Sequence, residues 1–223
     1  MKILLSWSSG KDSGWALHVL RQQGQAPAAL LTTINEVYDR VAMHGVRSEI
    51  LALQAEAAGL PLRTVRLPSP CSNAIYEDRM RTAVSQAVAD GFTHVAFGDL
   101  FLEDIRAYRE ERLRGTGLAP LFPLWKAPTH RLAEQMIADG LQAYLTCVDP
   151  RSLDPSFAGR PFDRRLLAEL PAGVDPCGER GEFHTCVTAG PMLTTDLRVR
   201  VGDVVERDSF VFADILPQLP AVL

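Results

Sequence analysis

The chain has 223 residues and a formal net charge of -4 at pH 7, and 47% of its residues are hydrophobic. This length suits one domain with an appendage or two small domains, and the hydrophobic fraction excludes a disordered chain. The negative net charge gives no sign of the basic surface that binds nucleic acid, which argues against a bulky RNA substrate.

Cysteine usage and hydropathy indicate the compartment. The cysteines are widely spaced and form no Cys-x-x-Cys pair, which argues against a zinc or iron-sulfur site and for reduced thiols. The apolar run after Lys2 is too short for a signal-peptide core, and no segment approaches the roughly 20 apolar residues of a membrane span. The sequence therefore predicts a soluble, cytoplasmic protein with no membrane partner.

A polar loop near the N-terminus follows an apolar run at 3–7 and opens a helical pattern. The first amides of a helix lack partners within it and carry partial positive charge, so such a loop predicts a phosphate site. Glycine lets the backbone approach the phosphate, lysine adds a positive charge, and aspartate can help to hold magnesium. An exposed loop lysine contributes little to packing, so replacing it should leave the fold intact. The loop reads Ser8, Ser9, Gly10, Lys11, Asp12, Ser13.

Strands and helices then alternate along the chain. Continuous apolar and β-branched strands are typical of a parallel sheet buried on both faces. The alternation predicts an α/β fold with a doubly wound parallel sheet, whose ligands bind beyond the carboxyl ends of the strands. Gly98 and Asp99 would then lie on the same rim as the loop. The predicted strands are 28–34, 62–67, 93–97 and 141–148; the predicted helices are the stretch ending at Gly24, then 47–58, 74–90, 102–113 and 129–139, with a loop at 35–45.

From residue 149 the pattern changes, because prolines punctuate the chain around one short helix at 163–170. Strands then dominate, with Gly202 and Asp203 as a turn signal. The sequence predicts two domains, at 1–148 and 149–223, the second smaller and of α+β type. The predicted strands of this part are 184–188, 198–201 and 209–213.

Three blocks of the sequence resemble known signatures. The loop lacks the glycine spacing of a Walker A loop and resembles the S-G-G-K-D-S signature of the ATP pyrophosphatases, or PP-loop enzymes, with Ser9 in place of the first glycine. Two further blocks and a turn resemble the diphthine-ammonia ligase family, and their order and spacing are hard to obtain by accident. They are Gly98 to Leu100 with Arg106 to Glu111, Gly117, Leu118 and Pro123 to Trp125; Cys177 to Thr185; and the turn His44 to Val46.

This resemblance implies a Rossmann-like, HUP-type domain that binds ATP at 1–148 and a smaller acceptor-binding domain at 149–223. It implies an ATP-dependent ligase that adenylates a carboxylate and amidates it with ammonia, releasing AMP and pyrophosphate. ATP is needed because a carboxylate is a poor electrophile, and the mixed anhydride carries a good leaving group. The partners would be ATP, ammonia and a carboxylate acceptor, either a small molecule or a modified protein side chain. A second copy of the chain, in a homodimer, is a further partner compatible with the sequence.

The resemblance also implies roles for individual residues. Asp12 and Asp99 would hold Mg²⁺. The catalytic candidates are Lys11, Arg109, Glu179 and Glu182. For Arg109 the alternative is a solvated helix face with ordinary ion pairs, and for the two glutamates it is an acidic surface turn. The expected cofactor-binding residues are Ser8, Ser9, Gly10, Lys11, Asp12, Ser13, His44, Gly98 and Asp99.

Two other functions fit the PP-loop signature. One is an RNA-modifying PP-loop enzyme, against which the missing cysteine pair and the acidic charge count. The other is a non-catalytic regulator that binds an adenine nucleotide. The serine at position 9, where the signature has glycine, favours this second function.

Overall fold

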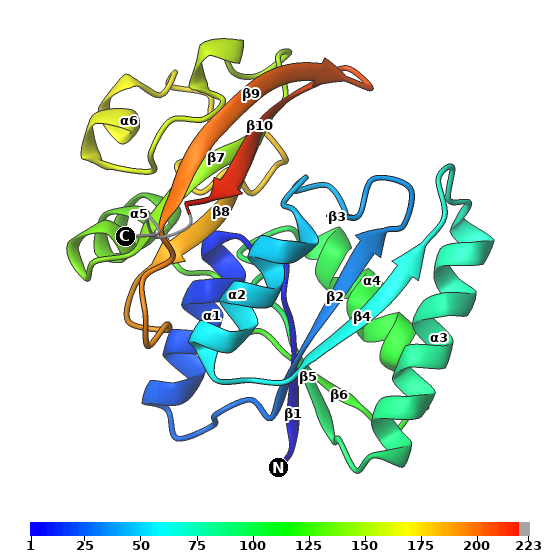
Figure 1. Cartoon of the computed structure of the whole chain (residues 1–223). Helices are drawn as coiled ribbons and strands as arrows, with labels where there is room; N and C mark the ends of the chain where they lie inside the picture. The colour runs from blue at the N-terminus through cyan, green and yellow to red at the C-terminus, as the bar shows by residue number, and fades with distance from the viewer. Residues whose placement is uncertain (219–223) are drawn as a thin grey trace, which may run out of the picture.

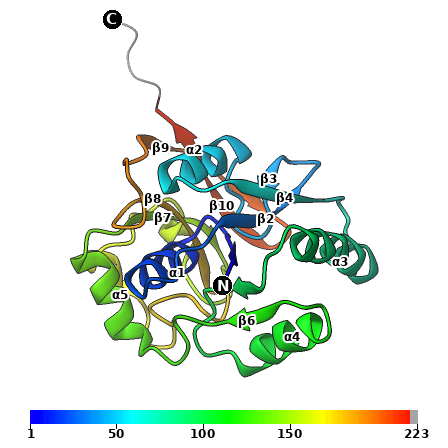
Figure 2. The same ribbon diagram turned by 90° about the horizontal axis from the view of Figure 1, so that it is seen from below.

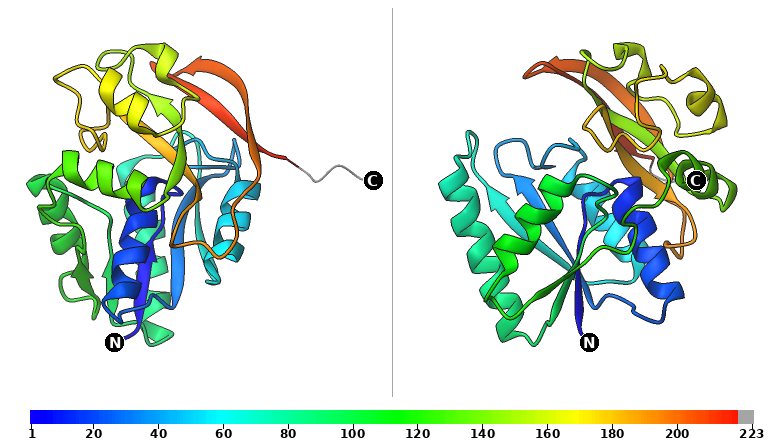
Figure 3. Two further views of the ribbon diagram at one scale, coloured as in Figure 1. Left: turned by 90° about the vertical axis from the view of Figure 1, so that its left-hand side faces the viewer. Right: turned by 180° about the vertical axis from the view of Figure 1, so that it is seen from behind.

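Two β-sheets lie one above the other in the structure, a computed structural model that describes residues 1–218 (Figure 1). Helices cover both faces of the lower sheet, and irregular segments with two short helices lie around the upper sheet (Figures 1 and 3). No helix within the described residues is long and apolar enough to cross a bilayer.

The lower sheet confirms the predicted doubly wound parallel architecture. Five strands run parallel in the order β4-β2-β1-β5-β6, and the short β3 pairs antiparallel with the end of β2, inside the segment predicted as a loop. The side chains of β1 alternate between two cores, with Leu4 on one face and Ile3 and Leu5 on the other. The strands are β1 (Ile3–Ser6), β2 (Ala29–Asn35), β3 (Arg40–Val41), β4 (Leu62–Leu67), β5 (His94–Ala96) and β6 (Ala119–Leu121).

The two faces of this sheet are covered unequally. Helices α1 (Lys11–Gln22) and α2 (Ser48–Ala58) pack on one face, and α3 (Asn73–Ala89) and α4 (Glu103–Leu113) lie on the other (Figure 2). Along α3 only Ala87 is buried, and along α4 only Leu113. The second pair of helices therefore leaves space above the sheet.

The upper sheet is antiparallel, in the order β8-β7-β10-β9. The sequence correctly predicts β7 as a strand, but its expected place in the parallel sheet is wrong because it pairs with β8 and β10. The elements are α5 (Thr129–Ala138), β7 (Gln142–Val148), a 3-10 turn (Pro155–Phe157), α6 (Arg164–Glu169), β8 (Phe183–Ala189), β9 (Val199–Arg207) and β10 (Phe210–Pro217).

The hairpin that joins β9 and β10 turns later than predicted. Gly202 and Asp203 lie inside β9, and the turn is formed by Asp208 and Ser209, whose φ angles are 50° and 66°. Two consecutive positive φ angles make a two-residue connection whose twist matches that of the strands. β9 is therefore one long strand at the edge of the sheet.

The two sheets share one hydrophobic core. A single buried cluster contains Trp7 and Leu17 from the lower layer together with Phe183, Val187 and Ile215 from the upper sheet. Strand β8 consequently lies against the N-terminal half of the chain, where the polar loop between β1 and α1 is located.

One ion-pair cluster also joins the two layers. Asp214 of β10 accepts hydrogen bonds from Arg40 Nη1 at 2.8 Å and from Arg47 Nη2 at 2.6 Å. Burial alone would raise the pKa of Asp214, but the two guanidinium groups lower it to about 2. The carboxylate is only 17% exposed, so its charge is stabilised mainly by these two arginines.

Replacing Asp214 with asparagine should lower the free energy of unfolding by about 2 kcal/mol at pH 7, because the hydrogen bonds from the two arginines lose their charged acceptor. The folded pKa lies below the ordinary value of 3.8, so this stabilisation is present above about pH 4 and disappears as the pH falls toward 2. Urea unfolding at pH 7 and pH 3 would measure the difference. Asp203→Asn on the same hairpin is the control, and equal losses in both variants would contradict the assignment.

Candidate functional site

A cavity of about 350 Å³ opens at the carboxyl ends of β1, β2 and β5. This is the rim at which ligands bind in doubly wound sheets. Most of the predicted site residues line it: Ser8, Asp12, Ser13, His44, Gly98, Asp99, Arg109 and Glu179. Ser9, Gly10, Lys11 and Glu182 are not part of its lining.

The loop from Ser8 to Ser13 is tightly folded against its neighbours. The Ser13 hydroxyl donates to the Gly10 carbonyl oxygen at 3.0 Å. The Ser8 hydroxyl lies 3.2 Å from the Ser13 hydroxyl. A Cβ at Gly10 would lie 2.6 Å from Cε1 of His44, and one at Gly98 would lie 2.9 Å from the Asp12 backbone. Both glycines are therefore required by the close approach of other groups.

Strand β8 and a buried glutamine hold this loop from behind. The Gln54 amide donates to the carbonyl oxygens of Ser9 at 3.0 Å and Val187 at 2.7 Å, and the Ser9 carbonyl also accepts the Val187 amide at 2.9 Å. The Thr185 hydroxyl accepts from the Lys11 amide, which is one of the free amides at the start of α1. The loop conformation thus depends on both sheets.

Ser9 occupies the left-handed region of backbone space. Its φ is 69°, its side chain is fully buried, and its hydroxyl has no hydrogen-bond partner among residues 1–218. A glycine would adopt this conformation without the steric cost of about 1 kcal/mol that a Cβ adds. Ser9 is not among the residues that line the cavity.

Lys11 is buried, so the expectation of an exposed loop lysine is wrong. Its ammonium donates to Asp12 Oδ2 at 2.8 Å and to the carbonyl oxygen of Cys177, and it lies over the rings of Phe162 and Phe183. Burial alone would lower the pKa of Lys11, but the neighbouring Asp12 carboxylate raises it. The ammonium of Lys11 therefore forms an internal contact that joins α1 to the segment before β8.

Asp12 and Asp99 give the cavity a pair of desolvated carboxylates. Burial raises the pKa of both groups, against the opposing effects of Lys11 on Asp12 and of Arg109 on Asp99. Oδ1 of Asp12 is buried and has no hydrogen-bond partner among the described residues. Within residues 1–218 no three His, Cys, Asp or Glu side chains group so as to hold a metal by themselves. The pair still fits Mg²⁺, which usually takes one or two carboxylates and completes its shell with water and phosphate.

The two glutamates near the C-terminal block have different surroundings. Oε1 of Glu179 accepts the Leu100 amide at 2.7 Å, and the side chain lines the cavity. Burial raises the pKa of Glu179 to about 7, with a contribution from the negative charge of Asp12. Both oxygens of Glu182 instead accept backbone amides, those of Asp175 at 3.0 Å and Arg180 at 2.9 Å. Glu182 therefore shapes the turn that carries Glu179.

Two histidines stack at the cavity wall. The rings of His44 and His184 have centroids 4.6 Å apart, and both line the cavity. Burial lowers the pKa of His44 to about 4 and that of His184 to about 3, so both rings are neutral at pH 7. Nδ1 of His44 lies 3.0 Å from the Thr185 carbonyl oxygen and must donate to it, which leaves Nε2 as an acceptor.

The arginines of α4 separate in the structure. Arg109 lines the cavity with its guanidinium 4.8 Å from the Phe97 ring centre and its Nε 3.5 Å from Asp99 Oδ2. Arg106 instead packs on the rings of Phe122 and Trp125 and pairs with Glu110. Of these two arginines, Arg109 is the one that lines the cavity.

Comparisons with known proteins identify the family of the chain. The family model described as the diphthamide synthase N-terminal domain matches residues 1–120, and that of the diphthamide synthase C-terminal domain matches residues 128–215. The chain belongs to the diphthamide synthase family. The predicted family resemblance is thereby confirmed, and the matches cover the polar loop, the rim at Gly98 and the turn before β8.

Individual relatives are more distant. The chain is 27% identical to diphthine-ammonia ligases of Bos taurus and Homo sapiens, over 96% of its own length and 89% of theirs. A crystal structure of a predicted subunit of tRNA methyltransferase from Methanocaldococcus jannaschii covers 88% of this chain and 100% of its own, with 18% identity and a TM-score of 0.46. That structural likeness is too weak to support a functional conclusion.

Several residues of the site are absent from the sequence predictions. Gln54 is detectable as a single polar side chain on the apolar stripe of a helix, and Tyr76, Met80 and Val84 of the cavity wall share one face of α3 at four-residue spacing. The contribution of Thr185 and of the Cys177 carbonyl has no local signal, because both act through contacts between distant segments.

Replacing Lys11 with alanine should destabilise the protein by about 3 kcal/mol, because it leaves the Asp12 carboxylate and the Cys177 carbonyl without their buried cation. The matched control is Lys126→Ala, whose side chain is 70% exposed and whose pair with Glu103 is long at 3.6 Å. That variant should change stability by less than about 1 kcal/mol. Chemical unfolding of both variants is the measurement, and an unchanged Lys11 variant would exclude a structural role for the ammonium.

Proposed function

We propose that this protein is an ATP-dependent ligase that adenylates a carboxylate and then amidates it with ammonia. The observation that carries the proposal is the convergence, on one cavity, of the α1 N-terminus, two desolvated carboxylates, Arg109 and Glu179. The membership of the diphthamide synthase family and the similarity to proteins named diphthine-ammonia ligase support it.

The first half-reaction needs a site for the phosphates of ATP. Ser8, Asp12 and Ser13 at the start of α1 line the cavity, and the helix dipole favours an anion there. An oxygen of the acceptor carboxylate attacks the α-phosphorus, the bond from that phosphorus to the bridging oxygen breaks, and pyrophosphate leaves. The acyl-adenylate keeps the AMP moiety.

Asp12 and Asp99 are the groups that would hold Mg²⁺ in this cavity. The ion would neutralise phosphate charge and supply electrostatic stabilisation of the departing pyrophosphate. The unpaired Oδ1 of Asp12 supports this assignment, because a buried carboxylate oxygen without a donor gains from a cation.

The second half-reaction needs ammonia and a proton acceptor. The nitrogen attacks the carbonyl carbon, the bond from that carbon to the AMP oxygen breaks, and AMP leaves. The attacking nitrogen must lose a proton, and Glu179, with a pKa of about 7, is placed to take it. The neutral Nε2 of His44 is a further acceptor in the cavity wall, and Lys11 and Glu182 contribute by fixing the loop and the turn.

The nucleotide products test this function. ATP with ammonium chloride and a panel of carboxylates should give AMP and pyrophosphate only when an acceptor is present, as read by ion-exchange chromatography of the nucleotides. ADP and orthophosphate would place the protein in another class. Turnover that depends on RNA would support the RNA-modifying alternative, and ATP binding without turnover would support a regulator.

Glu179→Gln should separate the two half-reactions. The amide oxygen can still accept the Leu100 amide, so acceptor-dependent exchange of pyrophosphate into ATP should be retained. Amide formation should fall by about 10²-fold because the general base is lost. Wild-type amide formation should rise as the pH passes the pKa of Glu179, which is about 7 in the free protein and higher beside a bound phosphate, and the variant should lose this step.

Glu182→Gln is the matched comparison for this experiment. It removes a charge from the same turn, but its oxygens face backbone amides rather than the cavity, so it should lower stability and affect both half-reactions alike. Equal effects of the two substitutions on amide formation, with exchange intact in both, would show that Glu179 has no special role as a base.

A further inference from the structure

A second chamber continues the cavity described above. It has a volume of about 500 Å³ and lies between α3 and α4, and the two spaces have six lining residues in common. Met80, Val84 and Phe97 form an apolar part of this junction, and Arg109 lies in it as the single charged group. The two spaces are therefore neighbours, and Arg109 is a charged group that both can reach.

The chamber is rich in positive charge. Arg81, Arg109 and Arg112 line it, against Glu77 as the only acidic residue among its lining residues. Arg112 pairs with Glu77, and Arg81 pairs with Asp78 at the surface. Arg109 is held less firmly, because its one ion pair, with Asp99, is long at 3.5 Å. Its two terminal nitrogens make no hydrogen bond to any described residue, so they can bind a carboxylate in the bidentate manner typical of arginine.

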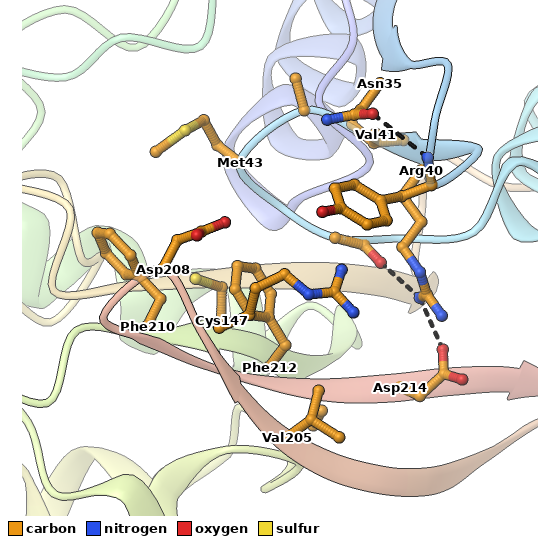
Figure 4. A pocket seen from close by; sticks show the side chains of 15 residues that line it. Asn35, Arg40, Val41, Met43, Cys147, Val205, Asp208, Phe210, Phe212 and Asp214 are labelled. Atoms are coloured by element: carbon orange, nitrogen blue, oxygen red, sulfur yellow. Dashed lines mark hydrogen bonds and ion pairs between the residues drawn. The ribbon is translucent and has the colours of Figure 1, made fainter. Parts of the chain in front are cut away.

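A third space, shown in Figure 4, is less suited to a carboxylate. This pocket of about 270 Å³ lies between the loop that carries β3 and the β9-β10 hairpin. Its charged lining is balanced, with Arg40 and Arg207 against Asp208 and Asp214, and Arg40 is already bound to Asp214 and to the Gly45 carbonyl oxygen. Arg207 lies over the Tyr38 ring at 4.3 Å and makes no ion pair within the described residues, but a carboxylate that reached it would also meet Asp208 and Asp214.

We propose that the chamber between α3 and α4 binds the acceptor, and that this acceptor is a small carboxylate with an apolar or aromatic body whose carboxylate is held by Arg109. The apolar lining from Met80, Val84 and Leu113 would accommodate the body, and Tyr76 and Tyr108 also line the chamber. This inference rests on the proposed function, because Arg109 then holds the nucleophilic oxygen beside the nucleotide cavity.

The position of Arg109 explains how one residue serves both spaces. A guanidinium bound to an acceptor carboxylate removes part of the repulsion between that anion and the phosphates of ATP. Its guanidinium lies 4.8 Å from the Phe97 ring centre, and this cation–π contact keeps it at the junction. The apolar body in the chamber would determine which carboxylates bind, since a single bidentate contact does not discriminate among them.

Calorimetric titration of 3-phenylpropanoate into the full-length protein tests the proposal, both without nucleotide and with saturating Mg²⁺ and α,β-methylene-ATP, which does not react. The probe should bind in both states. The amide 3-phenylpropanamide has the same body without the charge, and its affinity should be lower by about tenfold or more. Arg109→Gln should weaken binding of the carboxylate by about tenfold and leave that of the amide unchanged.

A second variant tests the chamber without touching Arg109. Ser85→Trp places a bulky side chain at a position that lines the chamber and not the nucleotide cavity, and Gln86→Trp is the control on the next, exposed position of α3. Only the first should weaken binding of 3-phenylpropanoate. Binding of the nucleotide analogue should be unchanged in both.

The outcomes are distinct. Competition between the analogue and 3-phenylpropanoate would assign the chamber to the nucleotide and overturn the proposal. So would equal binding of the acid and the amide, or an acceptor-dependent release of pyrophosphate with carboxylates that do not respond to Ser85→Trp. Failure of every acceptor to release AMP would count against the ligase function alone, because binding is measured without turnover.

Discussion

The buried ammonium group of Lys11 is the constraint on which the polar loop and the segment before β8 both depend. A charge of this kind is stable away from water only if an anion and further acceptors surround it, and here Asp12 and the Cys177 carbonyl meet that need. The contact joins the first residues of α1 to a segment more than 160 residues later in the chain. The cavity therefore exists only when both sheets are in place, and its geometry is coupled to the folding of the whole chain.

The space for ligands comes from incomplete burial. Helices α1 and α2 cover one face of the lower sheet with a continuous core, but α3 and α4 each bury one residue. The apolar side chains that α3 turns toward the sheet, Tyr76, Met80 and Val84, stay partly exposed at the cavities. Part of the hydrophobic surface that a closed core would remove from water is kept available, which costs stability and provides apolar contact area for a ligand. The position of these helices is thus a functional property of the fold.

The alternation of strands and helices was enough to predict the parallel sheet and the rim, because each strand carries its own apolar signal and the loop at Ser8 to Ser13 has a local motif. The placement of β7 could not be derived in this way, since an apolar strand does not indicate which partner it will pair with. The late hairpin turn is a similar case, because Gly202 is a turn signal that the long pairing of β9 with β10 overrides. The cavity lining was predicted where residues follow strands directly, as with Asp99. The burial of Lys11 and the different surroundings of Glu179 and Glu182 depend on contacts across the chain, which no local pattern records.

The carboxylates of the cavity affect how a polyphosphate can enter it. Asp12, Asp99 and Glu179 face Arg109 there, while the two histidines are neutral and the charge of Lys11 is committed to an internal pair. An incoming nucleotide therefore adds negative charge to a space that already has an excess of it. Glu179 has a pKa of about 7, so a nearby phosphate would shift it upward and the protein would take up a proton on binding. Under the proposed function, affinity for the nucleotide then depends on pH, and the number of protons that the site holds changes each time a nucleotide binds or leaves.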